Sequence, residues 1–178
     1  MLTLEQLNAL DRSEFTGAIG HIFEHSPWIA WTTWEQRPFA DADALAAALI
    51  DTMLAASTTQ QLTLILAHPD LAGKAALDNE LTPESSLEQA SAGLDRLSRQ
   101  EYVLFHELNG AYWAKFAFPF IICVRRHDKN SILSEFKRRL IRDEPSERRQ
   151  ALLEIGEIAR LRLADLLGTA QPVSLQAG

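Results

Sequence analysis

The sequence predicts an all-α fold: a single-domain bundle of about eight helices with one extended apolar segment. Apolar residues recur three and four positions apart along most of the chain, which is the spacing of one helix face. Residues that favour helix starts precede many of these runs, and no neighbouring pair of alternating runs supplies partner strands. The length of 178 residues and the hydrophobic content of 47% are sufficient for a core without disulfides.

The first helices follow from their caps and their apolar spacing. Helices are expected after Thr3, Ser13, Ser26-Pro27 and Asp41, and a further one over Gln60–Ala67. The run from Gln60 is also compatible with a strand, but nothing nearby offers a partner. Trp28, Trp31 and Trp34 lie three apart, a spacing typical of core or dimer contacts rather than of a ligand site.

The second half of the chain follows the same reasoning. Residues 72–83 contain Gly, Asn and Pro and are expected to form a loop. Later helices are expected from Ser86 to Gly93, from Ser98 through Tyr112, from Ser131 and from Pro145 to Gly168. On the helix from Ser131, the residues expected to face inward are Ile132, Leu133, Phe136, Leu140 and Ile141, with Lys137, Arg138 and Arg139 outward. The domain is expected to cover 1–168, followed by a disordered tail over 169–178.

One apolar stretch does not fit a helix. Phe116–Val124 is short and contains Pro119, so the segment near 117–124 is expected to be extended. An extended segment in a helical protein leaves backbone N–H and C=O groups without ladder partners. We therefore expect these groups to be available to a ligand.

Charge and cysteine content exclude several classes of function. The net charge of −7 argues against nucleic-acid binding, which requires a basic surface, but permits a small anionic substrate. No run of about 18 apolar residues is present, so no membrane span is expected. Cys123 is the only cysteine, which favours a reducing compartment. Together with an N-terminus that lacks a signal-peptide pattern, this predicts a cytoplasmic protein.

The strongest candidate for chemistry is His68, which precedes Pro69 at the end of an apolar run. A proline disfavours helical geometry in the residue before it, so His68 is expected at the end of an element. Downstream, Ser85 and Glu88 have the spacing of a capping box, and a helix start can bind an anion. An imidazole, the Glu88 carboxylate and the Gln89 carboxamide are therefore candidates for one site.

Two other patterns leave alternatives open. His21-Ile22-Phe23-Glu24-His25 matches the H-x-x-E-H motif of inverted zinc peptidases, and on a helix both imidazoles would bind zinc at about 2.0 Å. A third ligand is not evident, and Ser-Pro follows immediately. Arg162 lies next to an apolar helix face and requires a carboxylate partner, from the protein or from a substrate. Cys123 is interpreted as a small buried hydrophobe.

Taken together, these segments resemble one family, the 2-oxo-4-hydroxy-4-carboxy-5-ureidoimidazoline (OHCU) decarboxylases of urate breakdown. The resemblance rests on five ordered segments: Phe23–Trp28, Ala67–Gly73, Ser85–Leu94, Phe116–Val124 and Ile158–Leu166. In this family Phe-Glu-His-Ser-Pro-Trp is a landmark without a metal role. The resemblance implies an all-α enzyme without cofactor or metal, a homodimer that converts a small anionic substrate to (S)-allantoin and CO2.

The resemblance also implies roles for individual residues. His68 would be the catalytic acid/base and Glu88 its catalytic partner. The residues implied to contact substrate are Pro69, Ser85, Ser86, Leu87, Gln89, Phe120, Ile121, Ile122, Cys123, Val124 and Arg162. Ala117 and Arg142 stand where the family commonly has glycine and asparagine, which places local packing in doubt rather than activity. A zinc hydrolase and a non-catalytic helical interaction domain remain the alternative functions.

Overall fold

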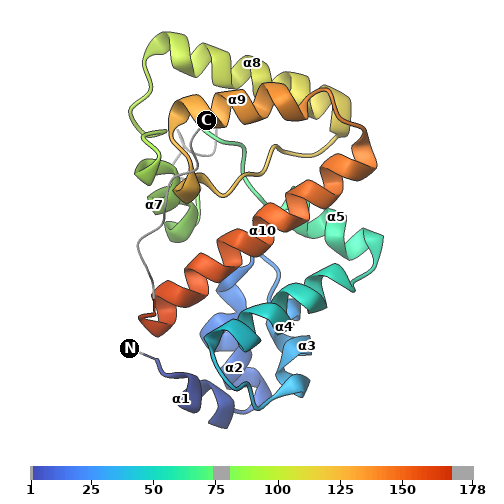
Figure 1. The fold of residues 1–178 in the computed structure, drawn as a ribbon, viewed down its shortest axis with the longest axis vertical. Coiled ribbons are helices and arrows are strands. Elements are labelled where there is room, and N and C mark those ends of the chain that lie inside the picture. The colour runs from blue at the N-terminus through green and yellow to red at the C-terminus, as the bar shows by residue number, and fades with distance from the viewer. Residues whose placement is uncertain (1, 74–80, 170–178) are drawn as a thin grey trace. The chain divides into compact units, whose positions relative to one another are not determined.

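The computed structural model describes residues 2–73 and 81–169, and these residues form two compact units (Figure 1). The first unit contains the described chain up to Ala67 together with residues 155–169. The second unit contains His68–Glu154. The greater part of the expected loop over 72–83 and of the expected tail over 169–178 lies outside the described residues.

Nine α-helices and three short 3-10 helices make up the regular structure of the described residues, which include no strand. The first unit contains α1 (Leu4–Ala9), α2 (Arg12–Ile19), η1 (Gly20–Ile22), α3 (Trp28–Thr33), η2 (Trp34–Gln36), α4 (Ala42–Leu54) and α5 (Thr58–Leu66). The second contains α7 (Pro83–Ser91), α8 (Arg99–Phe116), η3 (Val124–Arg126) and α9 (Lys129–Arg139). The long helix α10 (Glu144–Leu167) contributes residues to both units. The all-α class is confirmed.

Most helices begin where a side chain accepts a hydrogen bond from the first turn. The predicted caps are confirmed at Thr3, Asp41 and Ser98. Two predictions were wrong by two or three residues: Asp11 caps α2 in place of Ser13, and Asp128 caps α9 in place of Ser131. In each case an aspartate lies just upstream of the serine, and its carboxylate accepts the N–H of the third helical residue.

Helices α5 and α3 of the first unit begin in different ways. α5 confirms the helical prediction for the run from Gln60, and Ser57 supplies its capping box. The expected start of α3 was wrong, since Pro27 precedes the helix and neither Pro27 nor Ser26 caps it through a side chain. The Ser26 carbonyl instead accepts the N–H of Ile29 at 3.2 Å.

The tryptophan stripe does not form the core of the first unit. Trp31 is 46% exposed, and Trp28 and Trp34 are half-buried. The Arg12 guanidinium carbon lies 4.6 Å from the Trp31 ring centroid, and that of Arg37 lies 4.0 Å from the Trp34 ring. A tryptophan tolerates partial exposure when a cation covers its face. Of the two predicted roles, a core position is therefore wrong for Trp31, and a dimer contact stays a prediction. The core of this unit consists of aliphatic and phenylalanine side chains: Leu7, Phe15, Ile19, Leu45, Leu49 and Met53.

The core of the second unit is aromatic. Helices α8 and α9 pack side by side (Figure 1) and enclose a cluster of rings: Phe105, Tyr112, Phe116, Phe118, Phe120 and Phe136. Two predictions for the helix after Asp128 were wrong. Ile141 is 85% exposed beyond the end of α9, whereas Arg139, expected in solvent, is fully buried.

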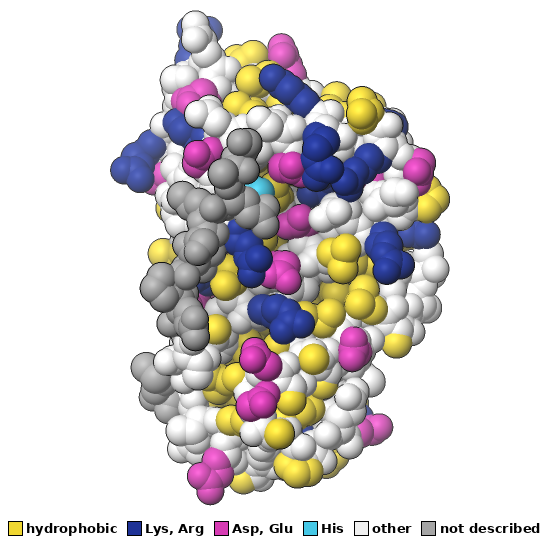
Figure 2. Space-filling view, in the orientation of Figure 1, with side chains coloured by type: hydrophobic (Ala, Val, Ile, Leu, Met, Phe, Trp, Pro, Cys, Tyr) yellow, Lys and Arg dark blue, Asp and Glu magenta, His cyan; other side chains and the backbone are white. Residues whose placement is uncertain are grey.

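Charge on the described surface is mixed. On the face shown in Figure 2, Lys and Arg side chains lie interspersed with Asp and Glu side chains. This arrangement differs from the clustered basic surface of nucleic-acid-binding proteins. In the described part of the chain, no helix combines the length and apolar character needed to cross a membrane.

Candidate active site

His68 lies at the end of an element, as its position before Pro69 predicted. Helix α5 ends at Leu66, Ala67 is its C-cap, and His68 follows directly. His68 is 9% exposed, so this titratable residue is largely withdrawn from water at the start of a loop. This loop, 68–73, belongs to the second unit and is called the His68 loop below.

Helix α7 attaches to the His68 loop through one side chain. The Gln89 Oε1 atom accepts a hydrogen bond from the Ala72 N–H at 2.9 Å, and Gln89 Nε2 lies 3.5 Å from the Asp70 carbonyl oxygen. Gln89 is buried. A residue expected to contact substrate therefore also holds the backbone next to the candidate catalytic histidine.

The inward and outward faces of α7 separate the expected substrate contacts. Ser85, Glu88 and Gln89 are three and four residues apart and share one face, on which Ser85 and Gln89 are buried and Glu88 is half-buried. Ser86 is exposed and Leu87 is 73% exposed, so their side chains lie on the solvent side of this helix. The second unit thus brings Ser85 and Gln89 to the buried side but not Ser86 or Leu87.

Helix α7 does not begin at Ser85, so the predicted capping box of Ser85 and Glu88 is wrong. The helix begins earlier, with Thr82 as N-cap and Pro83 at its first position. Pro83 has no N–H, the Ser85 N–H bonds to Thr82 Oγ1 at 3.3 Å, and the Ser86 N–H bonds to the Thr82 carbonyl at 2.9 Å. The Ser85–Glu88 pair is therefore inside the helix and does not form a capping box. These two side chains could contribute to a site through the helix face that they share, and not as caps of a helix start.

The segment predicted to be extended, 117–124, is non-helical over 117–123, and Val124 is the first residue of η3. Two of its backbone groups bond to side chains of the protein, and contact of the segment with a substrate stays a prediction. The Ile121 carbonyl accepts a hydrogen bond from Arg139 Nη1 at 2.7 Å, and the Cys123 N–H donates to Glu154 Oε2 at 2.9 Å. The five residues expected to line a pocket, Phe120–Val124, are all buried. At Ile121 and Cys123, side chains from α9 and α10 thus take the place of the ladder partners that an extended chain lacks.

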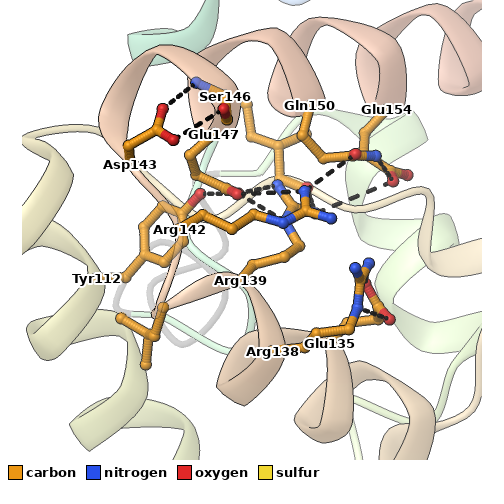
Figure 3. Close-up of polar contacts among 12 residues, drawn as sticks. Tyr112, Glu135, Arg138, Arg139, Arg142, Asp143, Ser146, Glu147, Gln150 and Glu154 are labelled. Atoms are coloured by element: carbon orange, nitrogen blue, oxygen red, sulfur yellow. Dashed lines mark hydrogen bonds and ion pairs between the residues drawn. The ribbon is translucent and has the colours of Figure 1, made fainter.

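Arg139 is the centre of a buried polar network (Figure 3). Its Nε atom donates to Glu147 Oε1 at 2.6 Å, and the Tyr112 hydroxyl donates to the same carboxylate oxygen. Burial raises the pKa of the Tyr112 hydroxyl above its ordinary value, and its bond to Glu147 acts in the same direction. The Tyr112 hydroxyl therefore keeps its proton at neutral pH and donates it in the hydrogen bond to Glu147. Hydrophobic periodicity missed this network, because it assigns a charged residue to the solvent face by default.

The described geometry of the second unit links three of the predicted stretches. Gln89 connects α7 to the His68 loop, and α7 packs against η3, which directly follows Cys123. Sequence reasoning missed two further residues at this loop, Asn109 and Trp113, whose side chains bond to Leu71 and Asp70. The available signal was Asn109 itself, a polar residue within the apolar face of α8.

Arg162 belongs to the first unit, where its required carboxylate partner is Glu24. Its Nη2 atom lies 3.2 Å from Glu24 Oε1, and Nη1 donates to the Ile22 carbonyl at 3.2 Å. Both Arg162 and Glu24 are buried. Of the two kinds of partner that the sequence left open, the structure contains the one from the protein.

The H-x-x-E-H pattern lacks the helical geometry that a zinc site would require. Helix α2 ends at Ile19, the short η1 ends at Ile22, and His25 has a φ of 45°. His21 and His25 are both exposed, and Glu24 is engaged by Arg162. Among the described residues, no group of three or more His, Cys, Asp or Glu side chains is placed to hold a metal ion.

Comparisons with known proteins agree with one another. The sequence model of the OHCU decarboxylase family matches residues 8–164. The chain is 42% identical over 165 residues to the 2-oxo-4-hydroxy-4-carboxy-5-ureidoimidazoline decarboxylase of Halalkalicoccus jeotgali, covering 93% of this chain and 92% of that protein. It is 43% identical over 164 residues to the same-named protein of Haloferax volcanii, covering 92% and 95%. A crystal structure of (S)-allantoin synthase superposes with a TM-score of 0.75 at 28% identity, covering 93% of this chain and 54% of that one.

Proposed function

Because this chain belongs to the OHCU decarboxylase family, we propose that it converts 2-oxo-4-hydroxy-4-carboxy-5-ureidoimidazoline to (S)-allantoin and CO2 in urate breakdown. The observation that carries the proposal is His68, a largely buried imidazole at the end of α5 in a loop bonded to α7. A proton donor withheld from water can deliver its proton to one face of a bound substrate.

The reaction itself requires no cofactor. Breaking the bond to the carboxylate releases CO2 and leaves an electron pair that the C=N and carbonyl groups of the substrate can delocalise. The protein must orient the carboxylate, stabilise the enolate-like charge and deliver one proton to the carbon that bears the ureido group. That carbon becomes the stereocentre of allantoin, so the face that receives the proton sets the enantiomer.

We assign these tasks to residues of the second unit. His68 delivers the proton, and Glu88 orients or charges its imidazole. Gln89 uses Oε1 to hold Ala72 and one Nε2 hydrogen for its long bond to the Asp70 carbonyl, and we propose that the second Nε2 hydrogen donates to a carbonyl oxygen of the ring or of the ureido group of the substrate. We further propose that Pro69, Ser85 and the buried segment Phe120–Val124 line the substrate pocket. The side chains of Ser86 and Leu87 are exposed, so we propose that these two residues contact the substrate only through their backbone.

The role of Arg162 is carried by the family resemblance alone. We propose that its guanidinium binds a carboxylate or oxygen of the substrate while Glu24 and the Ile22 carbonyl fix its position. Arg162→Ala is expected to raise KM as well as lower kcat, since it removes a charge partner from the bound anion. An unchanged KM in a folded variant would contradict this assignment.

The central experiment is His68→Asn. Freshly generated substrate, made from urate by urate oxidase and 5-hydroxyisourate hydrolase, is followed by absorbance and by circular dichroism of the allantoin formed. We expect kcat to fall on the order of 10²- to 10⁴-fold with a small change in KM. The allantoin that is formed should approach a racemate, because water can protonate either face.

The matched control is His106→Asn, because His106 is an exposed histidine on α8. This variant should keep full activity and full enantiomeric purity. If His68→Asn also did so, the proton-delivery mechanism would be refuted. If the unaltered chain did not accelerate CO2 loss at all, the non-catalytic helical interaction domain would become the better interpretation.

We also propose that the enzyme is a homodimer and works in the cytoplasm. The dimer is implied by the family resemblance, and a single buried cysteine suits a reducing compartment. Light scattering after size-exclusion chromatography tests the first proposal: the expected mass is twice the 19.9 kDa of one chain, and a monomer at micromolar concentration would contradict it.

A further inference from the structure

The His68 loop contains a turn that is not self-supporting. Ala72 has a φ of 50°, in the left-handed region that disfavours residues with a Cβ atom. A Cβ atom on Gly73 would lie 2.7 Å from Asp70 Cβ, so only glycine fits there. The one backbone bond that closes the turn, from the Gly73 N–H to the Asp70 carbonyl, is long at 3.4 Å. Contacts from outside the loop must hold this geometry in place.

Helix α8 supplies two of those contacts from adjacent turns of one face. Asn109 Nδ2 donates to the Leu71 carbonyl at 2.9 Å, and Trp113 Nε1 donates to Asp70 Oδ1 at 2.8 Å. The two donors are four residues apart and form hydrogen bonds to neighbouring residues of the loop. Gln89 of α7 adds the bond to Ala72 from a second helix. Three consecutive residues are thus fixed from two elements.

Asn109 lowers the stability of the fold relative to an apolar residue at the same position. It is 5% exposed, within an apolar face that includes Phe105 and Phe116, and its Oδ1 atom has no hydrogen-bond partner among the described residues. Exchanging the amide nitrogen and oxygen would place an oxygen against the Leu71 carbonyl, so the bond to Leu71 fixes the orientation. A buried acceptor without a partner destabilises the fold, and leucine would fill the site without that penalty. The donor to Leu71 is the one interaction that leucine cannot replace.

We propose that Asn109 and Trp113 are positioning residues for His68. They hold the His68 loop in the geometry in which the imidazole can deliver its proton to one face of the substrate. This inference rests on the proposed function, because it assigns these residues a role in the stereochemistry of proton delivery. Neither side chain needs to touch the substrate. Their effect passes through Leu71 and Asp70 to the residue that begins the loop.

The test compares Asn109→Leu, Trp113→Phe and the double variant with Phe105→Leu. Phe105 lies one turn before Asn109 in the buried face of α8, and its ring packs edge-on against the ring of Phe136 with 6.2 Å between the centroids. Phe105→Leu therefore controls for lost stability alone. We expect Asn109→Leu to lower kcat about 10- to 100-fold with KM within about threefold, because a small displacement of a catalytic group is sufficient for such a loss.

Two readouts separate positioning from simple destabilisation. The enantiomeric excess of the allantoin, corrected for uncatalysed decay, does not depend on how much enzyme is folded, and it should fall in Asn109→Leu and Trp113→Phe but not in Phe105→Leu. Amide hydrogen exchange within 68–73 should accelerate in the same two variants only.

The outcomes distinguish this inference from the proposed function. Full enantiomeric excess and an unchanged kcat in the double variant would overturn the positioning role, as would an equal loss of enantiomeric excess in Phe105→Leu. An unaltered chain without decarboxylase activity would refute the proposed function instead. In that case hydrogen exchange still decides whether α8 holds the loop, and unchanged exchange in the double variant would overturn that claim.

Discussion

Removing the Arg139 side chain should destabilise the protein more than removing any exposed basic residue. Arg139→Met keeps most of the volume but deletes the donors to Glu147 Oε1, at 2.6 Å from Nε, and to the Ile121 carbonyl, at 2.7 Å from Nη1. The buried Glu147 carboxylate would retain the Tyr112 hydroxyl and a distant guanidinium, that of Arg142, whose Nη1 lies 3.7 Å from Glu147 Oε2.

The expected magnitude follows from full burial of both partners, each of which has 0% side-chain exposure. Breaking such a pair by removing one member costs roughly 3–5 kcal/mol, because a charge is left buried. The double variant Arg139→Met/Glu147→Leu removes both charges and leaves the Ile121 carbonyl and the Tyr112 hydroxyl without their hydrogen-bond partners. It also removes two longer ion pairs, of Glu147 with Arg142 at 3.7 Å and of Arg139 with Glu154 at 4.0 Å, in which the remaining partner is part-exposed. At about 1 kcal/mol for each lost hydrogen bond, it should cost about 2 kcal/mol.

Urea unfolding at pH 7, followed by circular dichroism, measures these free energies, and Arg138→Met is the matched control. Arg138 neighbours Arg139 but forms an exposed pair with Glu135, so its removal should cost less than about 1 kcal/mol. A cost below about 1 kcal/mol for Arg139→Met, or a double variant no more stable than that single one, would refute this reasoning.

Two further predictions follow from the backbone and from a buried histidine. Ala117 has a φ of 58°, so Ala117→Gly should stabilise the protein by about 0.5–1 kcal/mol in urea unfolding, whereas Ala114→Gly within α8 should destabilise it by about 1 kcal/mol. Burial lowers the pKa of His127 below its ordinary value of 6.5, so the unfolded chain binds a proton first and stability should fall as the pH drops below 6.5. The same urea series in His127→Gln should show a weaker dependence, and an equal slope would contradict the assignment.

Local signals predicted most helices well. Thr3, Asp41 and Ser98 cap helices because a short polar side chain at such a position bonds to the next turn whatever the tertiary context. The cap predicted at Ser13 was wrong, because Asp11 two residues upstream has an equally short polar side chain and caps the helix in its place. Helix existence was therefore predictable, and its first residue less so.

The sequence predicted the position of the candidate catalytic residue, but not the buried residues that hold the segments around it. His68 was found because a histidine before proline must lie at an element end, and this is a local rule. Arg139 was missed because its burial depends on Glu147 and Ile121, which come from different elements. A partner eight residues away across a turn leaves no periodic trace in the sequence. The same holds for Asn109, whose bond to Leu71 spans 38 residues.

The single cysteine, Cys123, allows local opening of the extended segment to be measured by thiol labelling. Cys123 is buried, and its backbone N–H is held by Glu154, so a thiol reagent can reach the sulfur only when this stretch separates from α10. Since the chain has no other cysteine, every alkylation event in the unaltered protein counts one such opening. Labelling rates in native buffer therefore measure the local free energy of opening where the substrate pocket is proposed. Slower labelling in the presence of allantoin would indicate that ligand binding keeps this segment closed.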